Sequence, residues 1–127
     1  MTQAVLEGVA FALRDSLEVA RGLGIHIDSA KICGGGAKSP LWKRLIANIL
    51  NVTIEVPGSE EGPSMGAAML AAVASGEYDS VKSAAEAIVS VTEVIEPEPE
   101  LVEKYEKRYQ TFREIYPVLR PLFQKLD

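Results

Sequence analysis

This chain is poor in the residues that build disulfides and metal centres. Among its 127 residues there is one cysteine, Cys33, and one histidine, His26. A single cysteine excludes an internal disulfide and is typical of a protein from a reducing compartment, so we expect a cytoplasmic location. One histidine and one cysteine are also too few for the usual zinc sites. The sequence therefore predicts no metal ligands.

Positive charge is scarce, and long apolar runs are absent. The chain has 13 Lys and Arg against 18 Asp and Glu, which gives a net charge of -5 without a basic stripe. Binding to nucleic acid requires clustered cations that neutralise phosphates, so we expect no nucleic-acid partner. No apolar run is long enough to span a membrane, and the first residues do not resemble a signal peptide. The composition instead indicates a globular domain without a membrane partner.

What the chain does contain is a glycine-rich turn between a predicted strand and a predicted helix. Gly34, Gly35 and Gly36 follow the strand, and Ser39 with Pro40 begins the helix. Glycines allow a ligand to approach the backbone closely, and Ser followed by Pro is a strong signal for a helix start. Unpaired N–H groups at such a helix start attract phosphates. The same pattern also occurs in tight turns that bind no ligand.

The apolar periodicity divides the chain into alternating helices and strands. Steps of three and four residues predict helices, and β-branched runs predict strands. The predicted helices cover about residues 2–23, 39–50, 65–75, 80–90 and 101–126, and the predicted strands cover 29–33 and 52–56. Residues 91–95 form either a strand or an extended linker. The first strand, its following helix and the second strand predict a parallel, right-handed βαβ unit.

Two helices carry apolar stripes, and because the predicted sheet is small we expect the Val5, Val9 and Leu13 face of the first helix to have few partners. The stripe of the last helix is more typical of core packing than of a platform for stacking bases. Pro117 and Pro121 cannot donate helical hydrogen bonds, so they predict a kink or break near Tyr116. The stripe of the first helix consists of Val5, Val9, Leu13, Leu17 and Ala20, and that of the last helix of Leu101, Tyr105, Tyr109, Phe112, Tyr116, Leu119, Phe123 and Leu126.

Several residues outside the glycine turn are expected to have structural roles only. Cys33 is predicted to be a small buried hydrophobe, and Lys43 with Arg44 a solvated helix face. Ser64 is expected to cap the helix that begins at Met65. His26 is predicted to be exposed or structural rather than catalytic. The acidic pair Glu60 and Glu61 is predicted to be solvated loop rather than a metal ligand.

Four sequence blocks, in this order, resemble one family of enzymes. They are EGVAFALRDS (7–16), GGGAKSPLW (34–42), EGPSMGAAMLAA (61–72), and Tyr105 and Tyr109 followed by FREIYP (112–117). Together they resemble the C-terminal part of the FGGY carbohydrate kinases, most closely the xylulose kinases, over nearly the whole chain. The resemblance implies an α/β fold, a helix-rich fragment of the second ribonuclease-H-like domain of the actin-like ATPase fold, with a small remnant sheet.

The same resemblance implies transfer of the γ-phosphate of ATP, with magnesium, to a sugar hydroxyl. It places the backbone of Gly35 and Gly36 near the α-phosphate and ribose, and Ala37, Ser39 and Pro40 beside the adenine. It also implies that the Met65–Ala72 helix packs nearby. The family's phosphate-binding hairpin, its sugar-binding residues and its aspartate general base have no counterpart here. The resemblance therefore implies no catalytic residue in this chain, with the sugar and magnesium held mainly by other parts of a kinase.

These observations predict one unit of residues 1–127, with residues 97–127 as a C-terminal helical extension. Its expected role is the adenosine-binding part of an ATP-dependent xylulose kinase that is inactive in isolation. The alternative is a stand-alone nucleotide-binding or regulatory module that uses the same half-site. A dinucleotide-binding fragment fits less well, because GGGAKS lacks the G-x-G-x-x-G spacing. A small sheet with an unpaired edge also predicts exposed apolar surface or self-association.

Overall fold

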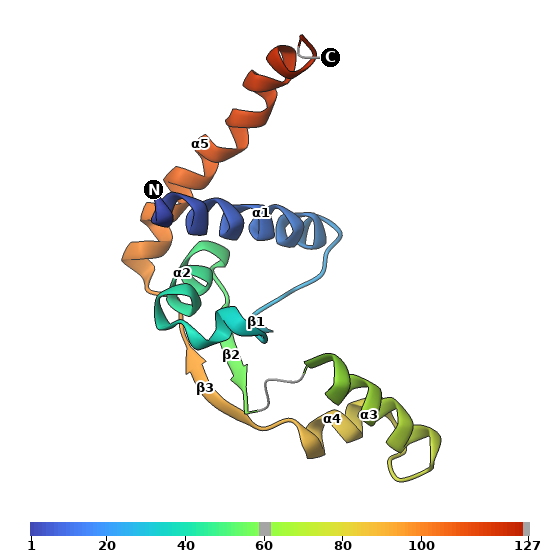
Figure 1. Ribbon diagram of the computed structural model, residues 1–127. Helices are drawn as coiled ribbons and strands as arrows, with labels where there is room; N and C mark the ends of the chain where they lie inside the picture. Colours follow the sequence, from blue (N-terminus) through green and yellow to red (C-terminus); the bar gives the residue numbers. More distant parts are fainter. Residues whose placement is uncertain (59–61, 126–127) are drawn as a thin grey trace.

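A computed structural model describes residues 1–58 and 62–125, which form three strands, five α-helices and one short 3-10 helix (Figure 1). Along the chain these elements are α1 (Thr2–Gly22), β1 (Ser29–Lys31), η1 (Gly35–Lys38), α2 (Pro40–Leu50), β2 (Thr53–Pro57), α3 (Gly62–Ala74), α4 (Val81–Ile88), β3 (Val91–Ile95) and α5 (Pro99–Phe123). The predicted helix-rich α/β fold with a small sheet is confirmed.

The three strands form one mixed sheet in the order β1-β2-β3. β1 and β2 are parallel and are joined through α2, so the predicted parallel pairing of the βαβ unit is confirmed. Residues 91–95 are a strand rather than a linker, since β3 pairs antiparallel to β2 with Ile95 opposite Ile54. β1 ends at Lys31, two residues earlier than predicted, although the Ile32 N–H still donates to the Glu55 carbonyl at 3.0 Å.

One hydrophobic core joins α1, α2, α5 and the sheet. α2 is the central element, because most of its second half is buried between the sheet and the two long helices. Figure 1 shows α1 lying across α2 and the first part of α5. The buried core residues are Ala10, Phe11, Leu45, Ile46, Ala47, Ile49, Leu50, Val52, Ile54 and Tyr109.

The apolar face of α1 formed by Val5, Val9 and Leu13 has few partners, as predicted. Val5, Val9 and Leu13 are 66%, 48% and 47% exposed, while Phe11 and Arg14 are buried. The reason is that α1 is apolar on more than one side. Turning Phe11 inward brings it against the aromatic rings of α5, which buries more surface than the valines would.

The predicted break of the last helix does not occur, because α5 runs through Pro117 and Pro121 to Phe123. This part of the helix is exposed, so the carbonyl groups that lose a helical donor are accessible to water. The aromatic stripe is accordingly core only in its first half. Tyr116 and Phe123 are 64% and 48% exposed.

Lys43 is buried rather than solvated, because β3 places Glu93 against it and the two side chains form an ion pair. Arg44 is exposed, as predicted, and its guanidinium pairs with Glu98 at 2.7 Å. This arginine holds the pKa of the Glu98 carboxyl below its usual range. A second contact also links α2 to Glu98. The side-chain oxygen of buried Asn48 accepts a 2.6 Å hydrogen bond from the Glu98 N–H.

α3 and α4 pack on each other and form an outlying part of the molecule (Figure 1). α3 begins at Gly62, so Ser64 lies inside the helix and is not its N-cap, contrary to prediction. Gly76 follows the helix end with a φ of +81°, a conformation that favours glycine. Three residues with predicted roles, Glu60, Glu61 and Leu126, lie outside the described residues.

Candidate nucleotide site

The glycine turn lies where the carboxyl ends of β1 and β2 meet, the edge at which parallel sheets bind ligands. The turn is closed from within by two hydrogen bonds. The Ala37 N–H donates to the Gly34 carbonyl at 3.0 Å, and the Ser39 N–H donates to the Gly36 carbonyl at 3.1 Å. Gly34 has a φ of +84°, so this position requires glycine. The sequence did not predict that residues 35–38 form a 3-10 helix.

Gly35 and Gly36 differ in what surrounds them. A Cβ on Gly36 would lie 2.8 Å from Cδ1 of Trp42, so this glycine is needed for the turn to pack on α2. A Cβ on Gly35 would meet no heavy atom within 4 Å. The open space beside Gly35 therefore leaves its backbone accessible to a ligand, whereas Gly36 supports the shape of the turn.

Ser39 and Pro40 start α2 as predicted. The Ser39 hydroxyl accepts a 3.3 Å hydrogen bond from the Trp42 N–H, and Pro40 occupies the first helical turn. This cap satisfies one amide that was expected to be unpaired, so fewer donors at the helix start remain for a phosphate. Pro40 also faces a separate hollow that is lined by Leu41 and Leu101.

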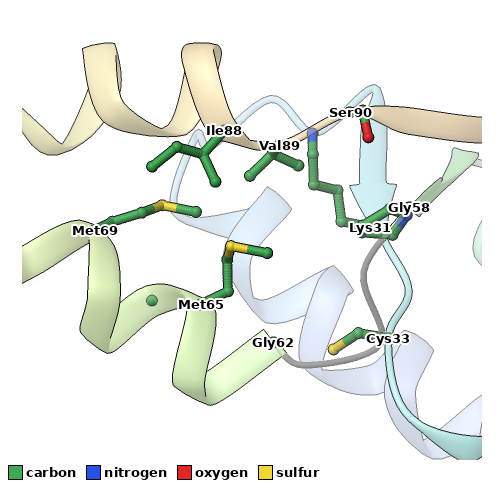
Figure 2. A pocket seen from close by; sticks show the side chains of 11 residues that line it. Lys31, Cys33, Gly58, Gly62, Met65, Met69, Ile88, Val89 and Ser90 are labelled. Atoms are coloured by element: carbon green, nitrogen blue, oxygen red, sulfur yellow. The ribbon is translucent and has the colours of Figure 1, made fainter.

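Two cavities flank the end of β1. The larger has a volume of about 380 Å³ and lies between the sheet and the α3–α4 pair. Figure 2 shows Met65 and Met69 reaching it from α3, and Ile88 and Val89 lying on its α4 side. The smaller cavity has a volume of about 150 Å³ and lies against the turn. Its lining includes Gly34, Ala37 and Lys38, and it shares Cys33, Pro57 and Gly58 with the larger cavity.

Cys33 lies at the junction of the two cavities and is exposed, so the prediction of a buried cysteine is wrong. Its sulfur faces the start of α3, where a Cβ on Gly62 would lie 3.2 Å from Sγ. The thiol is exposed because the strand ends before it and the chain turns away. The direct sequence neighbour Gly34 was the available signal that Cys33 borders the turn.

Lys31 brings charge to the rim of the larger cavity, which is otherwise mainly apolar. It is the register partner of Glu55, and its ammonium lies 2.7 Å from the Glu55 carboxylate. Hydrogen bonding and attraction to this ammonium lower the pKa of Glu55. Sequence analysis missed Lys31 as a lining residue. Met65 and Met69 lie on the helix that the resemblance places near the site, but their place in the lining depends on a strand that is far away in the chain.

Within residues 1–58 and 62–125, no group of three or more His, Cys, Asp or Glu side chains is arranged to hold a metal ion. His26 is exposed and lines a different hollow, beside Arg21 and Asp28. The described helices also include none with the length and hydropathy needed to cross a bilayer.

Comparison with known proteins gives the family. The model of the C-terminal domain of the FGGY family of carbohydrate kinases matches residues 1–75. The chain belongs to the FGGY family of carbohydrate kinases. It is 44% identical over 114 residues to a xylulose kinase from Staphylococcus epidermidis, a match that covers 90% of this chain and 23% of that protein.

Solved structures of FGGY kinases agree with this assignment. A gluconate kinase from Lactobacillus acidophilus superposes with a TM-score of 0.89 at 26% identity, over 100% of this chain and 26% of that one. A ligand-bound xylulose kinase from the same organism gives a TM-score of 0.85, also at 26% identity and with the same coverage. The chain thus spans about a quarter of the length of these relatives. The predicted family and fold class are confirmed.

Proposed function

We propose that this chain is the adenosine-binding part of an ATP-dependent sugar kinase whose sugar is xylulose. The observation that carries the proposal is the glycine turn at the carboxyl ends of two parallel strands, open at Gly35 and flanked by two cavities that share lining residues. The family membership supports the nucleotide, and the similarity to a xylulose kinase supports the sugar.

Within this proposal the residues of the turn have distinct tasks. The exposed backbone of Gly35 lies against the α-phosphate and ribose, and Gly36 keeps the turn packed on Trp42. Ala37, which lines the smaller cavity, borders the adenine. Ser39 and Pro40 fix the start of α2 and flank the base. Backbone contacts of this kind suit an anion, because glycine permits close approach.

Magnesium, the sugar and the general base are proposed to belong mainly to other parts of a full-length kinase. Residues 1–127 then act as one nucleotide-binding-side unit with a helical extension from residue 97, in the cytoplasm. Phosphoryl transfer requires a positioned base and a metal-held phosphate, so the isolated chain is expected not to phosphorylate xylulose. Detection of xylulose phosphate above a mock-purified control would contradict this.

The single cysteine provides a direct test of nucleotide binding. Cys33 is the only thiol in the chain and borders both cavities, so its rate of labelling by a maleimide reports occupancy of the site. ATP or ADP is expected to slow labelling at least about threefold, whereas xylulose alone should leave the rate unchanged. Labelling that is insensitive to millimolar ATP and ADP would contradict the proposed site.

Three glycine variants separate binding from folding. Gly35→Val places a side chain in open space, so the thermal midpoint should hold while protection of Cys33 by nucleotide is lost. Gly22→Val also meets open space but lies at the end of α1, and it should keep the protection. Gly36→Ala should lower the thermal midpoint because of Trp42, so loss of binding in that variant would carry no information on contact.

We also propose that the isolated chain self-associates. Large apolar side chains are exposed on α1 and on the second half of α5, including Val5, Val19 and Val118 at 66%, 67% and 70%. Exposed apolar surface of this extent is more typical of an interface than of a monomer. Light scattering over a range of protein concentrations measures this directly.

A further inference from the structure

The indole of Trp42 lies directly against the glycine turn. Trp42 is in the first turn of α2, where its backbone N–H donates to the Ser39 hydroxyl at 3.3 Å. A Cβ on Gly36 would lie 2.8 Å from Cδ1 and 2.9 Å from Nε1 of this indole, which is closer than real Cβ atoms approach. The edge of the five-membered ring therefore occupies the space that a side chain at residue 36 would need.

This contact explains why residue 36 is a glycine. Gly34 has a φ of +84°, so its backbone conformation alone favours glycine. Gly36 lies in the 3-10 helix η1, and the described glycines with a positive φ are Gly24, Gly34 and Gly76. The backbone at Gly36 therefore suits any L-residue. The three heavy atoms nearest to an added Cβ all belong to Trp42, so the indole is what excludes a side chain.

Trp42 also connects the turn to the hydrophobic core. Its side chain is half-buried and packs against the core residues of α2 and its neighbours. Two backbone hydrogen bonds close residues 34–39 into one unit, and this unit rests on the indole at Gly36. Gly35, whose backbone is open to a ligand, directly precedes the residue that is held. The position of the indole therefore determines the position of the open backbone.

We infer that Trp42 is a positioning residue of the proposed nucleotide site. The inference rests on the proposed function and adds the residue that sets the shape of its ligand-binding turn. In this scheme the indole does not touch the nucleotide, but holds Gly36 so that the Gly35 backbone meets the α-phosphate and ribose. A displacement of about 1 Å in such a positioning element can reduce function by about a hundredfold. Loss of the indole should therefore weaken nucleotide binding even where the chain remains folded.

A double-mutant cycle in the 127-residue chain tests the contact. Gly36→Ala should lower the thermal midpoint of the unmodified chain, because the new Cβ meets the indole. In a Trp42→Ala background the same substitution should cause little further loss, since the space is then empty. Trp42→Val serves the same purpose if Trp42→Ala does not fold. Gly35→Ala meets no heavy atom within 4 Å, so it is the matched control whose effect should be the same in both backgrounds.

Protection of Cys33 from maleimide by ADP tests the positioning role. The variants are compared at a temperature at which circular dichroism shows each of them to be folded. Trp42→Ala should raise the ADP concentration needed for protection at least about fivefold. Trp42→Phe retains an aromatic edge beside Gly36 and should restore protection. Leu41→Ala, which removes the exposed neighbour of Trp42 on α2, should leave it unchanged.

The outcomes separate this inference from the proposed function. Additive losses in the cycle, or unchanged ADP protection in folded Trp42→Ala, would overturn the positioning role and leave the nucleotide site intact. A tryptophan with only a structural role would give the second of these results, a lower thermal midpoint with unchanged protection. Lack of ADP protection in the unmodified chain would instead contradict the proposed function and, with it, the role of Trp42.

Discussion

The two halves of α5 both carry large apolar and aromatic side chains, but they have opposite environments. In the first half Tyr105, Tyr109 and Phe112 surround Phe11 of α1, with ring centroids 5.3 to 6.5 Å apart. In the second half Tyr116 and Phe123 contact each other at 6.5 Å but remain exposed. The difference teaches that a continuous apolar stripe is buried only as far as a partner helix extends. Stability should therefore depend on the first half and association on the second.

The largest contrast is expected from paired aromatic truncations. Phe11→Ala removes the ring on which the first half of α5 packs, and the free energy of unfolding should fall by about 3–5 kcal/mol. Phe123→Ala, in the second half, should change it by less than about 0.5 kcal/mol. Urea denaturation followed by circular dichroism, at a protein concentration where association is absent, measures both. Equal losses in the two variants would refute the comparison.

Arginine substitutions should show the next largest contrast. Arg14 is buried beneath α5, where it donates to the Ile49 carbonyl at 3.1 Å and to Glu106 at 2.5 Å. Arg14→Met keeps much of the volume but removes both contacts, and should cost about 2 kcal/mol, since Glu106 is partly exposed and regains water. Arg113→Met, on the exposed half, serves as the control and should cost less than about 0.5 kcal/mol in the same denaturation experiment.

The tyrosine hydroxyls offer a subtler comparison. The Tyr109 hydroxyl donates a 2.6 Å hydrogen bond to Asp15, so Tyr109→Phe should destabilise the fold by about 1 kcal/mol at neutral pH. Tyr116→Phe should have no measurable effect on unfolding. If both variants had the same free energy of unfolding, the hydrogen bond to Asp15 would not contribute to the stability of the fold.

Alkaline pH sharpens this comparison. Burial, together with the hydrogen bond to Asp15, raises the pKa of Tyr109 from 10.0 to about 12. Because the folded-state pKa is raised, the stabilisation is fully present below pH 10 and is lost as the pH rises towards 12. Tyr109→Phe should reduce this alkaline loss, as measured by thermal melts across that pH range, whereas Tyr116→Phe should leave it unchanged.

The smallest effect is expected from the ion pair at the edge of the buried half. Arg108 donates to both carboxylate oxygens of Glu7, at 2.7 and 2.8 Å. Glu7→Gln should cost about 0.5–1 kcal/mol, and less at high salt. The exposed pair of Lys82 and Glu86 is 3.9 Å apart, so Glu86→Gln provides a control with no expected change. A salt-independent loss for Glu7→Gln would indicate a packing effect instead.

Much of the local structure could be predicted from sequence. Ser39 and Pro40 start α2, and the β-branched run before Pro57 forms β2, because these signals act through neighbouring backbone groups. The family could also be predicted, since its motifs occur in order along the chain. The roles of Gly35, Gly36, Ala37, Ser39 and Pro40 toward a nucleotide remain predictions.

The errors share a cause that lies outside any one segment. Cys33 was predicted to be buried from its residue type, but the chain turns away directly after it. Lys43 was predicted to be solvated, but β3 places Glu93 on it from 50 residues away. Pro117 was predicted to kink or break α5, but the helix is unbroken because water can hydrogen-bond to the carbonyl groups that lose a helical donor. In each case a distant element or the solvent decided the outcome.

By itself, the sequence determined where α1 and α2 form, the βαβ unit and the kinase family, because each depends on short-range hydrogen bonding or on ordered motifs. Only the tertiary structure decided that Phe11 rather than Val5 faces inward, and that Met65 and Met69 meet the end of β1 to line a cavity. The physical reason is that burial depends on the surface that another element offers. That surface is created by contacts between residues far apart in the chain.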